Sequence, residues 1–558
     1  MAFNRATEPG PANLIVAGGR VETRDGSCPV AEALAIRDGR FVAVGDRRAV
    51  DAFRGPATRV IDLGGGMAVP GFGDAHVHPT HGGLAMARCE FHSDAYSRTL
   101  DEYLGIVAAY VAANPDRPWI LGGGWSMGDF PNGTPRREDL DRVAPDRPAY
   151  LPNRDGHSAW VNTRALEIAG ITNDTADPYD GRIERDPDGS ASGSLHDGAM
   201  DLVERHVPPT TLAEMSDGLR AGQRYLHTLG ISAWQDAIVE PLDESAYRAL
   251  GASGELTARV VGALWWDRHR GLEQIDELLE RRARGPAGRF RPTSVKIMQD
   301  GVLETFTGAV LEPYLGRDGQ PTTNTGPSMV DPALLAEAVT RLDRNGFQVH
   351  FHAIGERAVR ECLDAVAAAR RANGPSPNRH HISHIQVVHP DDIDRFAALD
   401  VIANAQALWA VHERQLDELT IPFLGAERAG WQYPFGSLLR AGARLAMGSD
   451  WPVSSPNPLL EMEHAVTRVA WLLRGEREPF LPAERLTLDQ ALAGFTTGTA
   501  FVNHSETETG SIEVGKLADL AILDRDLFAP DAGPIGDARV LATIVEGELV
   551  YEAAGLTG

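Results

Sequence analysis

Two histidines in the segment GFGDAHVHP, residues 71–79, have the types and spacing of a metal site. His76 and His78 are two residues apart, so in an extended strand both imidazoles point to the same side. Two imidazoles on one side can bind one cation, and neutral imidazole suits zinc while also accepting iron, nickel and manganese. We therefore interpret His76 and His78 as metal ligands at the end of a buried strand.

Other ligand-type residues stand on apolar strands that otherwise have no reason to carry them. They are Lys296 in SVKIMQDG, His350 and His352 in QVHFHAIGE, His384 in HISHIQVV and Asp450 in LAMGSDWPV. Burying a lone cation or carboxylate costs several kcal/mol unless the group is paired or bound to a metal. A metal site would supply the partner that Lys296 and Asp450 both require.

Purely structural roles stay open for some of these residues. Lys296 could form a salt bridge with the nearby Asp300 or Glu304, and Asp450 could cap a loop in Gly-Ser-Asp. Of the two histidines in QVHFHAIGE only one needs to face a metal. We expect His350 to be the other one, a hydrogen-bonded core residue.

Helices and apolar strands alternate through the second half of the chain. In VDPALLAEAVTRLDRNG we expect Asp331 as the N-cap, Pro332 at the first helical position and Gly346 as the terminator. Such alternation predicts a parallel sheet. Eight strands are expected, near residues 70–77, 231–236, 258–264, 294–299, 348–353, 381–387, 401–407 and 444–449. The prediction is an α/β fold, a (β/α)8 TIM barrel with its chemistry at the carboxyl ends of the strands.

Two further parts are expected outside the barrel. Short apolar runs separated by Gly and Asp-Gly turns occupy Asn13 to Asp62 and again the last fifty residues, which is typical of strands and hairpins. Residues 1–69 and 500–558 are therefore predicted to form a small composite β-sandwich domain, and residues 70–499 the barrel. Residues 90–225 would be a lobe inserted after the first barrel strand, over the barrel mouth.

Composition excludes several classes of protein. The formal charge of −25 repels phosphate backbones and anionic lipid surfaces, so neither nucleic acid nor a membrane is an expected partner. Three cysteines without CxxC spacing provide neither a disulfide framework nor a thiolate site. There is no run of about 18 apolar residues, and we expect a cytoplasmic location. Only two lysines occur, Lys296 and Lys516, so Lys296 is a candidate for chemistry that arginine cannot perform.

Several motifs taken together resemble those of a known family. PGFGDAHVHP, VKIMQDG, HAIGE, SHIQVV, GSDWPV and TGSIEVGKLADLAILD are similar to segments of the amidohydrolase superfamily. Within it, the chain most resembles amidohydrolase family 3, the group that contains N-substituted formamide deformylase. The likeness spans about residues 13–552 and also includes DGHSAWVNTRALEIAGI, residues 155–171.

The resemblance implies a ligand set for one or two divalent ions, most simply zinc. His76 and His78 would hold one ion together with Asp450. His352 and His384 would hold a second ion. The remaining residue, Lys296, would be carboxylated and bridge both ions through its carbamate, a product that an always protonated arginine could not form.

The resemblance further implies an enzyme that hydrolyses a carbonyl–nitrogen bond, such as a non-peptide amide or an N-substituted formamide. Metal ions lower the pKa of bound water toward about 7 and polarise the carbonyl. Asp450 would accept the proton of that water and pass it to the leaving amine. Two alternatives remain, an enzyme for a lactone, ester or cyclic amidine and, as the weakest, a non-catalytic binding protein.

The inserted lobe offers candidate substrate contacts. Trp125 and Trp160 have Gly-rich or polar neighbours and suit the wall of a pocket for an apolar or aromatic small molecule, although they could equally fill the core of the lobe. His157 is a candidate polar contact. Family members often show Gln-Pro where this chain has Gln406 and Ala407, followed by Leu408 and Trp409, so we expect a reshaped pocket there. A homodimer is considered as the assembly.

Overall fold

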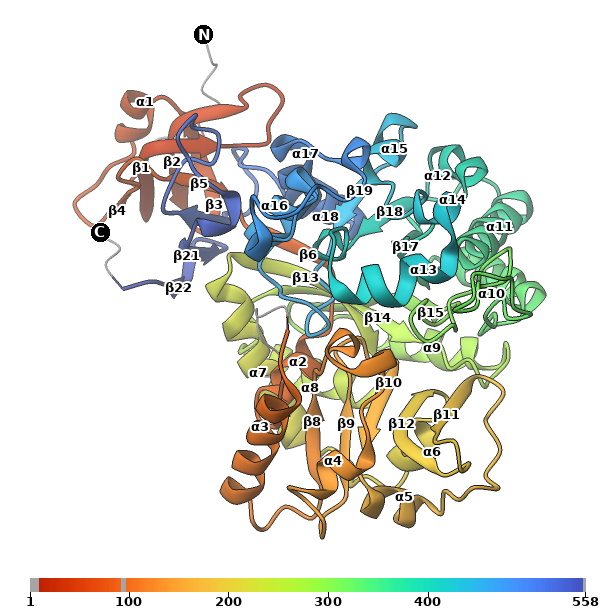
Figure 1. Ribbon diagram of the computed structural model, residues 1–558. Helices are drawn as coiled ribbons and strands as arrows, with labels where there is room; N and C mark the ends of the chain where they lie inside the picture. Colours follow the sequence, from red (N-terminus) through yellow and green to blue (C-terminus); the bar gives the residue numbers. More distant parts are fainter. Residues whose placement is uncertain (1–9, 92–96, 555–558) are drawn as a thin grey trace.

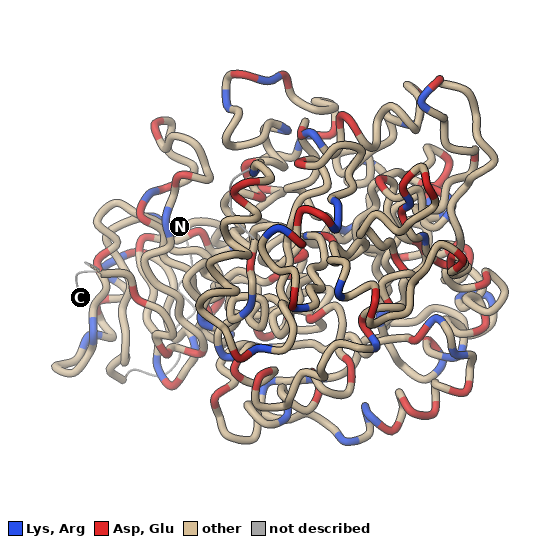
Figure 2. Tube along the Cα trace, turned by 60° about the horizontal axis from the view of Figure 1, so that its bottom comes forward, with Lys and Arg blue, Asp and Glu red and all other residues tan. Residues whose placement is uncertain are grey.

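The computed structural model describes residues 10–91 and 97–554. Figure 1 shows three parts, a central barrel, a β domain where the two termini lie, and a lobe of strands and short helices beside the barrel. Acidic and basic residues are interspersed along the whole trace (Figure 2), with 78 Asp and Glu against 53 Lys and Arg in the sequence. No helix in the described residues is long and apolar enough to cross a membrane.

The barrel is an eight-stranded parallel sheet, as predicted. Most residues of these strands are buried, which is typical of a sheet covered on both faces. In spatial order the strands are β6 (Phe72–Val77), β13 (Ile231–Val239), β14 (Arg259–Trp265), β15 (Phe290–Met298), β16 (Gln348–Ala353), β17 (His381–His384), β18 (Ile402–Ala405) and β19 (Leu445–Met447).

Hydrogen bonds join the first barrel strand, β6, to β18 and to the loop after β19; we call this junction the seam. Asn404 of β18 donates from Nδ2 to the carbonyl of Ala75 in β6, at 2.9 Å. The backbone N–H of Ser449 donates to Asp74 Oδ1 at 3.0 Å, and the N–H of Asp450 donates to the carbonyl of His76 at 2.7 Å. These bonds hold β6 against β18 and against the loop that follows β19.

Helices between the strands cover the outside of the barrel. The helix after β15, α10, begins as predicted, because the side chain of Asp331 accepts from Ala333 N and Leu334 N and Pro332 occupies the first turn. It is followed by Gly346, which has a φ of 75°. The outer helices are α7 (Leu212–Thr228), α8 (Pro241–Ser253), α9 (Gln274–Ala283), α10 (Pro332–Arg344), α11 (Glu356–Asn373), α12 (Ile393–Ala398), α15 (Phe435–Arg440) and α16 (Pro458–Thr467).

The β domain joins strands from both ends of the chain. Strand β5 (Met67–Pro70) lies between the N-terminal β1 (Leu14–Glu22) and the C-terminal β20 (Leu520–Leu523). Its other strands are β2 (Val30–Arg37), β3 (Arg40–Gly45), β4 (Arg59–Asp62), β21 (Val540–Val545) and β22 (Glu548–Glu552). Because β5 is separated from β6 by one residue, this domain fixes the point where the chain enters the barrel.

The lobe lies between β6 and β13 in the sequence. Its six strands pair in the order β11 (Gly181–Arg185), β12 (Ala191–Asp197), β10 (Ser158–Val161), β9 (Ala149–Pro152), β8 (Ile120–Gly123) and β7 (Cys89–Glu90). Loops of this sheet around His157 and Asp197 line the cavity that also contains the carboxyl ends of the barrel strands. The lobe therefore forms one wall of the cavity. The predicted boundaries between the three parts stay predictions.

Candidate metal centre

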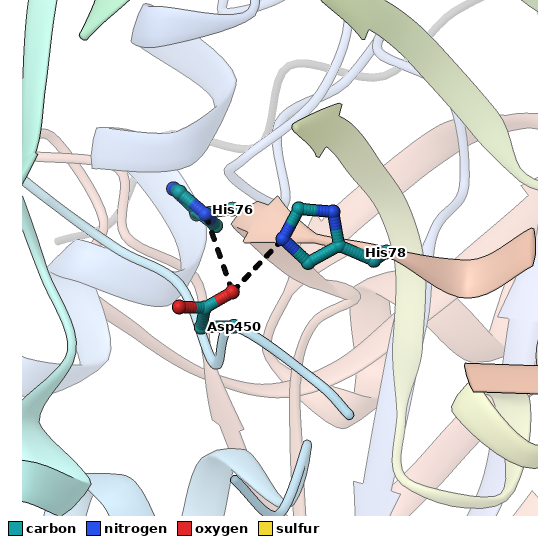
Figure 3. Close-up of side chains that lie close together, drawn as sticks. All are labelled: His76, His78 and Asp450. Atoms are coloured by element: carbon teal, nitrogen blue, oxygen red, sulfur yellow. Dashed lines mark hydrogen bonds and ion pairs between the residues drawn. The ribbon is translucent and has the colours of Figure 1, made fainter. Parts of the chain in front are cut away.

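Three side chains from the two sides of the seam converge on one point. His78 Nε2 lies 2.9 Å from Asp450 Oδ1, and His76 Nε2 lies 3.3 Å from the same oxygen. Figure 3 shows both imidazoles directed at the Asp450 carboxylate, the histidines from the end of β6 and the aspartate from the loop after β19. One ligand atom from each residue lies within 4.8 Å of the other two, which is the arrangement of a group able to hold a metal ion.

Buried hydrogen bonds fix the backbone around this group. Asp74 is fully buried; its Oδ1 accepts from His76 N at 3.0 Å, and its Oδ2 accepts from Ser449 Oγ at 2.5 Å. Asp450 itself has a φ of 57°, in the left-handed region that a non-glycine residue adopts only when its surroundings require it. The hydrogen bonds of the seam and this backbone conformation therefore fix the direction of the Asp450 carboxylate.

Lys296 reaches the same group from β15. Its Nζ lies 3.4 Å from His76 Nε2, and the residue is 3% exposed. Burial lowers the pKa of Lys296 to about 7, although Asp450 and Asp236 favour the charged form. The two residues considered as salt-bridge partners bond elsewhere: Asp300 accepts three backbone N–H groups, and Glu304 accepts from Thr420 Oγ1 at 2.7 Å.

His352 and His384 lie on the other side of the cavity floor, with ring centroids 4.4 Å apart. His384 Nδ1 is 3.7 Å from Asp450 Oδ2 and, although buried, has no hydrogen-bond partner among the described residues. The indole of Trp409 stacks on the His384 ring at 5.3 Å and 10°. Gln406 Oε1 accepts from the His384 backbone N–H at 2.8 Å, so the segment 406–409 does shape this part of the site.

His350, the other histidine of β16, contacts His76 and not the cavity. Its Nε2 lies 2.9 Å from His76 Nδ1 and 2.7 Å from Ser383 Oγ. Because each ring has two nitrogens, a hydrogen bond at His76 Nδ1 leaves His76 Nε2 for the Asp450 side. The expected core role of His350 thus includes orienting a candidate ligand, as partners of ligating histidines commonly do.

Electrostatics leave these groups in the forms that bind cations. Burial, together with the charge of Lys296, lowers the pKa of His76 to about 3. Burial likewise lowers the pKa of His78, His352 and His384, so the imidazoles are neutral at pH 7. Burial alone would raise the pKa of Asp450, but His76 and His78 outweigh it and hold the pKa well below its usual range.

The donor set fits a divalent metal. Neutral imidazole nitrogens and one carboxylate oxygen are ligands that zinc accepts, and a buried His384 nitrogen without a partner is the feature that a bound cation would explain. The structure brings together all six residues of the predicted ligand set, His76, His78, Lys296, His352, His384 and Asp450, along the floor of one cavity of about 510 Å³.

The three predicted substrate contacts lie in two different places, one at the cavity and two in the core of the lobe. His157 lines the cavity, with its Nδ1 2.7 Å from Asp197 Oδ1. Trp125 and Trp160 are fully buried in the core of the lobe, where their indole N–H groups donate to the carbonyls of Leu151 and Arg136. Both therefore fill the lobe core, the alternative left open by the sequence, and neither contributes to the cavity wall.

One residue outside the predicted ligand set, Asp300, holds the loops beside the site in place. Asp300, directly after β15, is fully buried and accepts from Ala309, Ile354 and Gly355 N at 2.8 to 2.9 Å. Burial raises its pKa to about 7, despite these three bonds. Asp300 thus ties the loop after β15 to the turn that follows His352. The sequence signal for this role is an acidic residue close to the end of an apolar strand, which the sequence by itself suggests only as an alternative salt-bridge partner of Lys296.

Comparison with known proteins agrees with this geometry. The amidohydrolase family matches residues 59–551. Protein LONG AFTER FAR-RED 3 of Arabidopsis thaliana is 32% identical over 97% of this chain and 92% of its own length. N-substituted formamide deformylase of Arthrobacter pascens is 27% identical over 97% of this chain and 99% of its own.

A solved structure shows the same architecture. The crystal structure of an uncharacterized metal-dependent hydrolase from Pyrococcus furiosus aligns with a TM-score of 0.69 and 25% identity, over 92% of this chain and 99% of that protein. The family match covers most of the chain, including every residue of the candidate metal centre. The chain therefore belongs to the amidohydrolase family, and it is a hydrolytic enzyme that acts on carbon–nitrogen bonds other than peptide bonds.

Proposed function

We propose that this enzyme hydrolyses a non-peptide amide, of the N-substituted formamide kind, at a zinc-dependent centre. The observation that carries the proposal is the convergence of neutral imidazoles, one ionised carboxylate and one buried amine on the floor of a cavity. A divalent metal bound there would lower the pKa of water toward about 7 and polarise the carbonyl of the substrate.

The ligands would be shared between two positions. His76, His78 and Asp450 would hold one ion, since they form the compact group with ligand atoms within 4.8 Å. His352 and His384 would hold a second ion, which the adjacent rings and the unpartnered His384 Nδ1 support.

Lys296 would supply the bridge between the two positions as a carbamate. In this step the lone pair of the neutral Nζ forms a bond to the carbon of CO2 and one amine proton is released, which leaves an anionic carboxylate on the side chain. A pKa of about 7 makes a large fraction of the amine neutral at physiological pH. The scarcity of lysine elsewhere supports a specific role, because arginine cannot react in this way.

Asp450 would move the proton. Its carboxylate is ionised at neutral pH, and Oδ1 is held between His76 and His78. Oδ2 lies on the His384 side, where it can accept a proton from the attacking water and return it to the nitrogen of the leaving amine. His157 faces the same cavity and is the candidate polar contact to the substrate.

The substrate is proposed to be a small molecule with an apolar or aromatic part. A cavity of about 510 Å³ is within the range of small-molecule sites, roughly 300–1,000 Å³. The similarity to N-substituted formamide deformylase over 97% of this chain supports a formamide-like bond.

Purified enzyme should be assayed against N-formyl amines, N-acyl amines, lactones and cyclic amidines, with metal content measured in the same preparation. We expect release of the amine from an N-formyl or N-acyl compound, with one or two zinc ions per chain. The Asp450→Asn variant is the control for contaminating activity. Turnover of lactones or amidines with no turnover of any amide would overturn the proposal.

A further inference from the structure

A second cavity lies directly beside the metal centre, and we call it the aromatic side pocket. Its volume is about 340 Å³. Six aromatic side chains from the lobe, α7 and the loops after β18 and β19 line it: Phe91, Tyr103, Tyr225, Trp409, Trp451 and Trp471. An apolar cavity of about 150 Å³ already holds one benzene ring, so the side pocket has room for a substituted aromatic group.

Three charged groups at this pocket, those of Arg154, Glu413 and Asp129, bond to other groups of the protein. Arg154 donates from Nη2 to Glu413 Oε1 and to Gln415 Oε1, both at 3.0 Å. Asp129 Oδ2 accepts from Tyr103 Oη at 2.7 Å and from Arg98 N at 3.0 Å. With these polar atoms paired, the six rings present faces and edges to a ligand, which favours an uncharged apolar or aromatic group.

The side pocket adjoins the metal centre. Trp409 and Val453 line both cavities. Trp409 stacks on the ring of the candidate ligand His384, and its Nε1 donates to Ser454 Oγ at 3.2 Å, which fixes the plane of the indole. A substrate that occupies both cavities must therefore lie against Trp409 and Val453.

We propose that the aromatic side pocket is the binding subsite for an aromatic or branched apolar substituent of the amide substrate. The scissile bond lies at the metal centre, and the substituent extends past Trp409 and Val453. This inference rests on the proposed function and adds to it the place and the chemistry that select the substrate. Trp125 and Trp160 have no part in the selection.

Kinetics with two matched substrates test the subsite. N-ethylformamide and N-phenethylformamide differ by one phenyl ring, and Trp471→Ala removes an aromatic wall that lies in the side pocket but not in the metal cavity. We expect Trp471→Ala to lower kcat/KM for N-phenethylformamide by roughly three- to tenfold and to leave N-ethylformamide unchanged. Trp431→Ala is the matched control, because Trp431 is also half-buried but lines neither of the two cavities. Equal effects on both substrates, or no effect on either, would overturn the inference.

A second measurement does not depend on catalysis. Crystals soaked with para-bromophenol should show the anomalous signal of bromine among the rings of the side pocket. A signal found only elsewhere, or none at all, refutes the subsite. Failure of the wild-type enzyme to hydrolyse either formamide would count against the proposed function, and the bromine position would still decide whether the side pocket binds aromatic groups.

Discussion

The carboxylation of Lys296 is the sharpest expectation from the structure, because only an uncharged amine can add to CO2. With a pKa of about 7, half of the Lys296 amine is neutral at pH 7. A lysine with the ordinary value of about 10.4 is neutral in roughly one molecule in 2,500 at that pH, so burial raises the reactive fraction by about a thousandfold.

The direction of the pH dependence follows from this value. Lowering the pH protonates Nζ and blocks addition. At constant dissolved CO2, the initial rate of carbamate formation on metal-free protein should therefore rise roughly tenfold between pH 6 and pH 8 and then level off, whereas the rate at an ordinary lysine continues to rise toward pH 10.

The chain carries its own reference for this experiment. Lys516, the other lysine, donates to Ser511 Oγ and the Glu506 carbonyl and pairs with Glu513 in the C-terminal part of the chain. After incubation with isotopically labelled CO2, carbamates can be trapped by O-alkylation and located by peptide mass spectrometry. Modification of Lys516 as fast as Lys296 at pH 7, or an initial rate at Lys296 that still increases above pH 9, would refute the reasoning.

Four further results are expected. Removal of metal with a chelator should abolish activity, and added zinc should restore it in the wild type but not in His78→Ala; full recovery of that variant would contradict the assigned ligand. Asp450→Asn should lower kcat by about 10²–10⁴-fold, the usual contribution of a general base, and a loss below tenfold would remove its proton role. Trp160→Phe deletes the hydrogen bond to the Arg136 carbonyl and should cost about 1 kcal/mol of stability in thermal unfolding while kcat/KM stays constant. Asp300→Asn leaves at least one of the three backbone N–H groups without its acceptor, so it should destabilise the protein by about 1–3 kcal/mol, and an unchanged melting temperature would show that the loop is held by other contacts.

The barrel strands could be predicted because a sheet buried on both faces requires short runs rich in apolar residues, and the helices between them carry their own start and stop residues. The strand expected at 381–387 is an instructive exception, since it ends at His384. His384 and Ile385 have φ values of 76° and 42°, a turn that directs the His384 ring toward the cavity. That turn contains no glycine, so nothing local in the sequence announces it.

The contacts of individual side chains were harder to predict than the strands. Trp125 and Trp160 sit in segments that suit either a pocket wall or a packed core, and only the arrangement of the whole lobe decides between them. Asp300 is four residues after Lys296, which suggested an ion pair. The strand ends at Met298, so the alternation of side chains stops there and Asp300 turns toward backbone amides instead.

The seam of the barrel also has a consequence for biogenesis. His78 and Asp450 are separated by 372 residues, yet they meet across the junction where the sheet closes on itself. A nascent chain that has emerged only as far as β18 has the two histidines but lacks the aspartate and the Asp74–Ser449 bonds that hold the junction. Binding of the proposed metal ion would therefore have to wait until the C-terminal end of the barrel is in place, and a bound ion would help to hold the two ends of the sheet together.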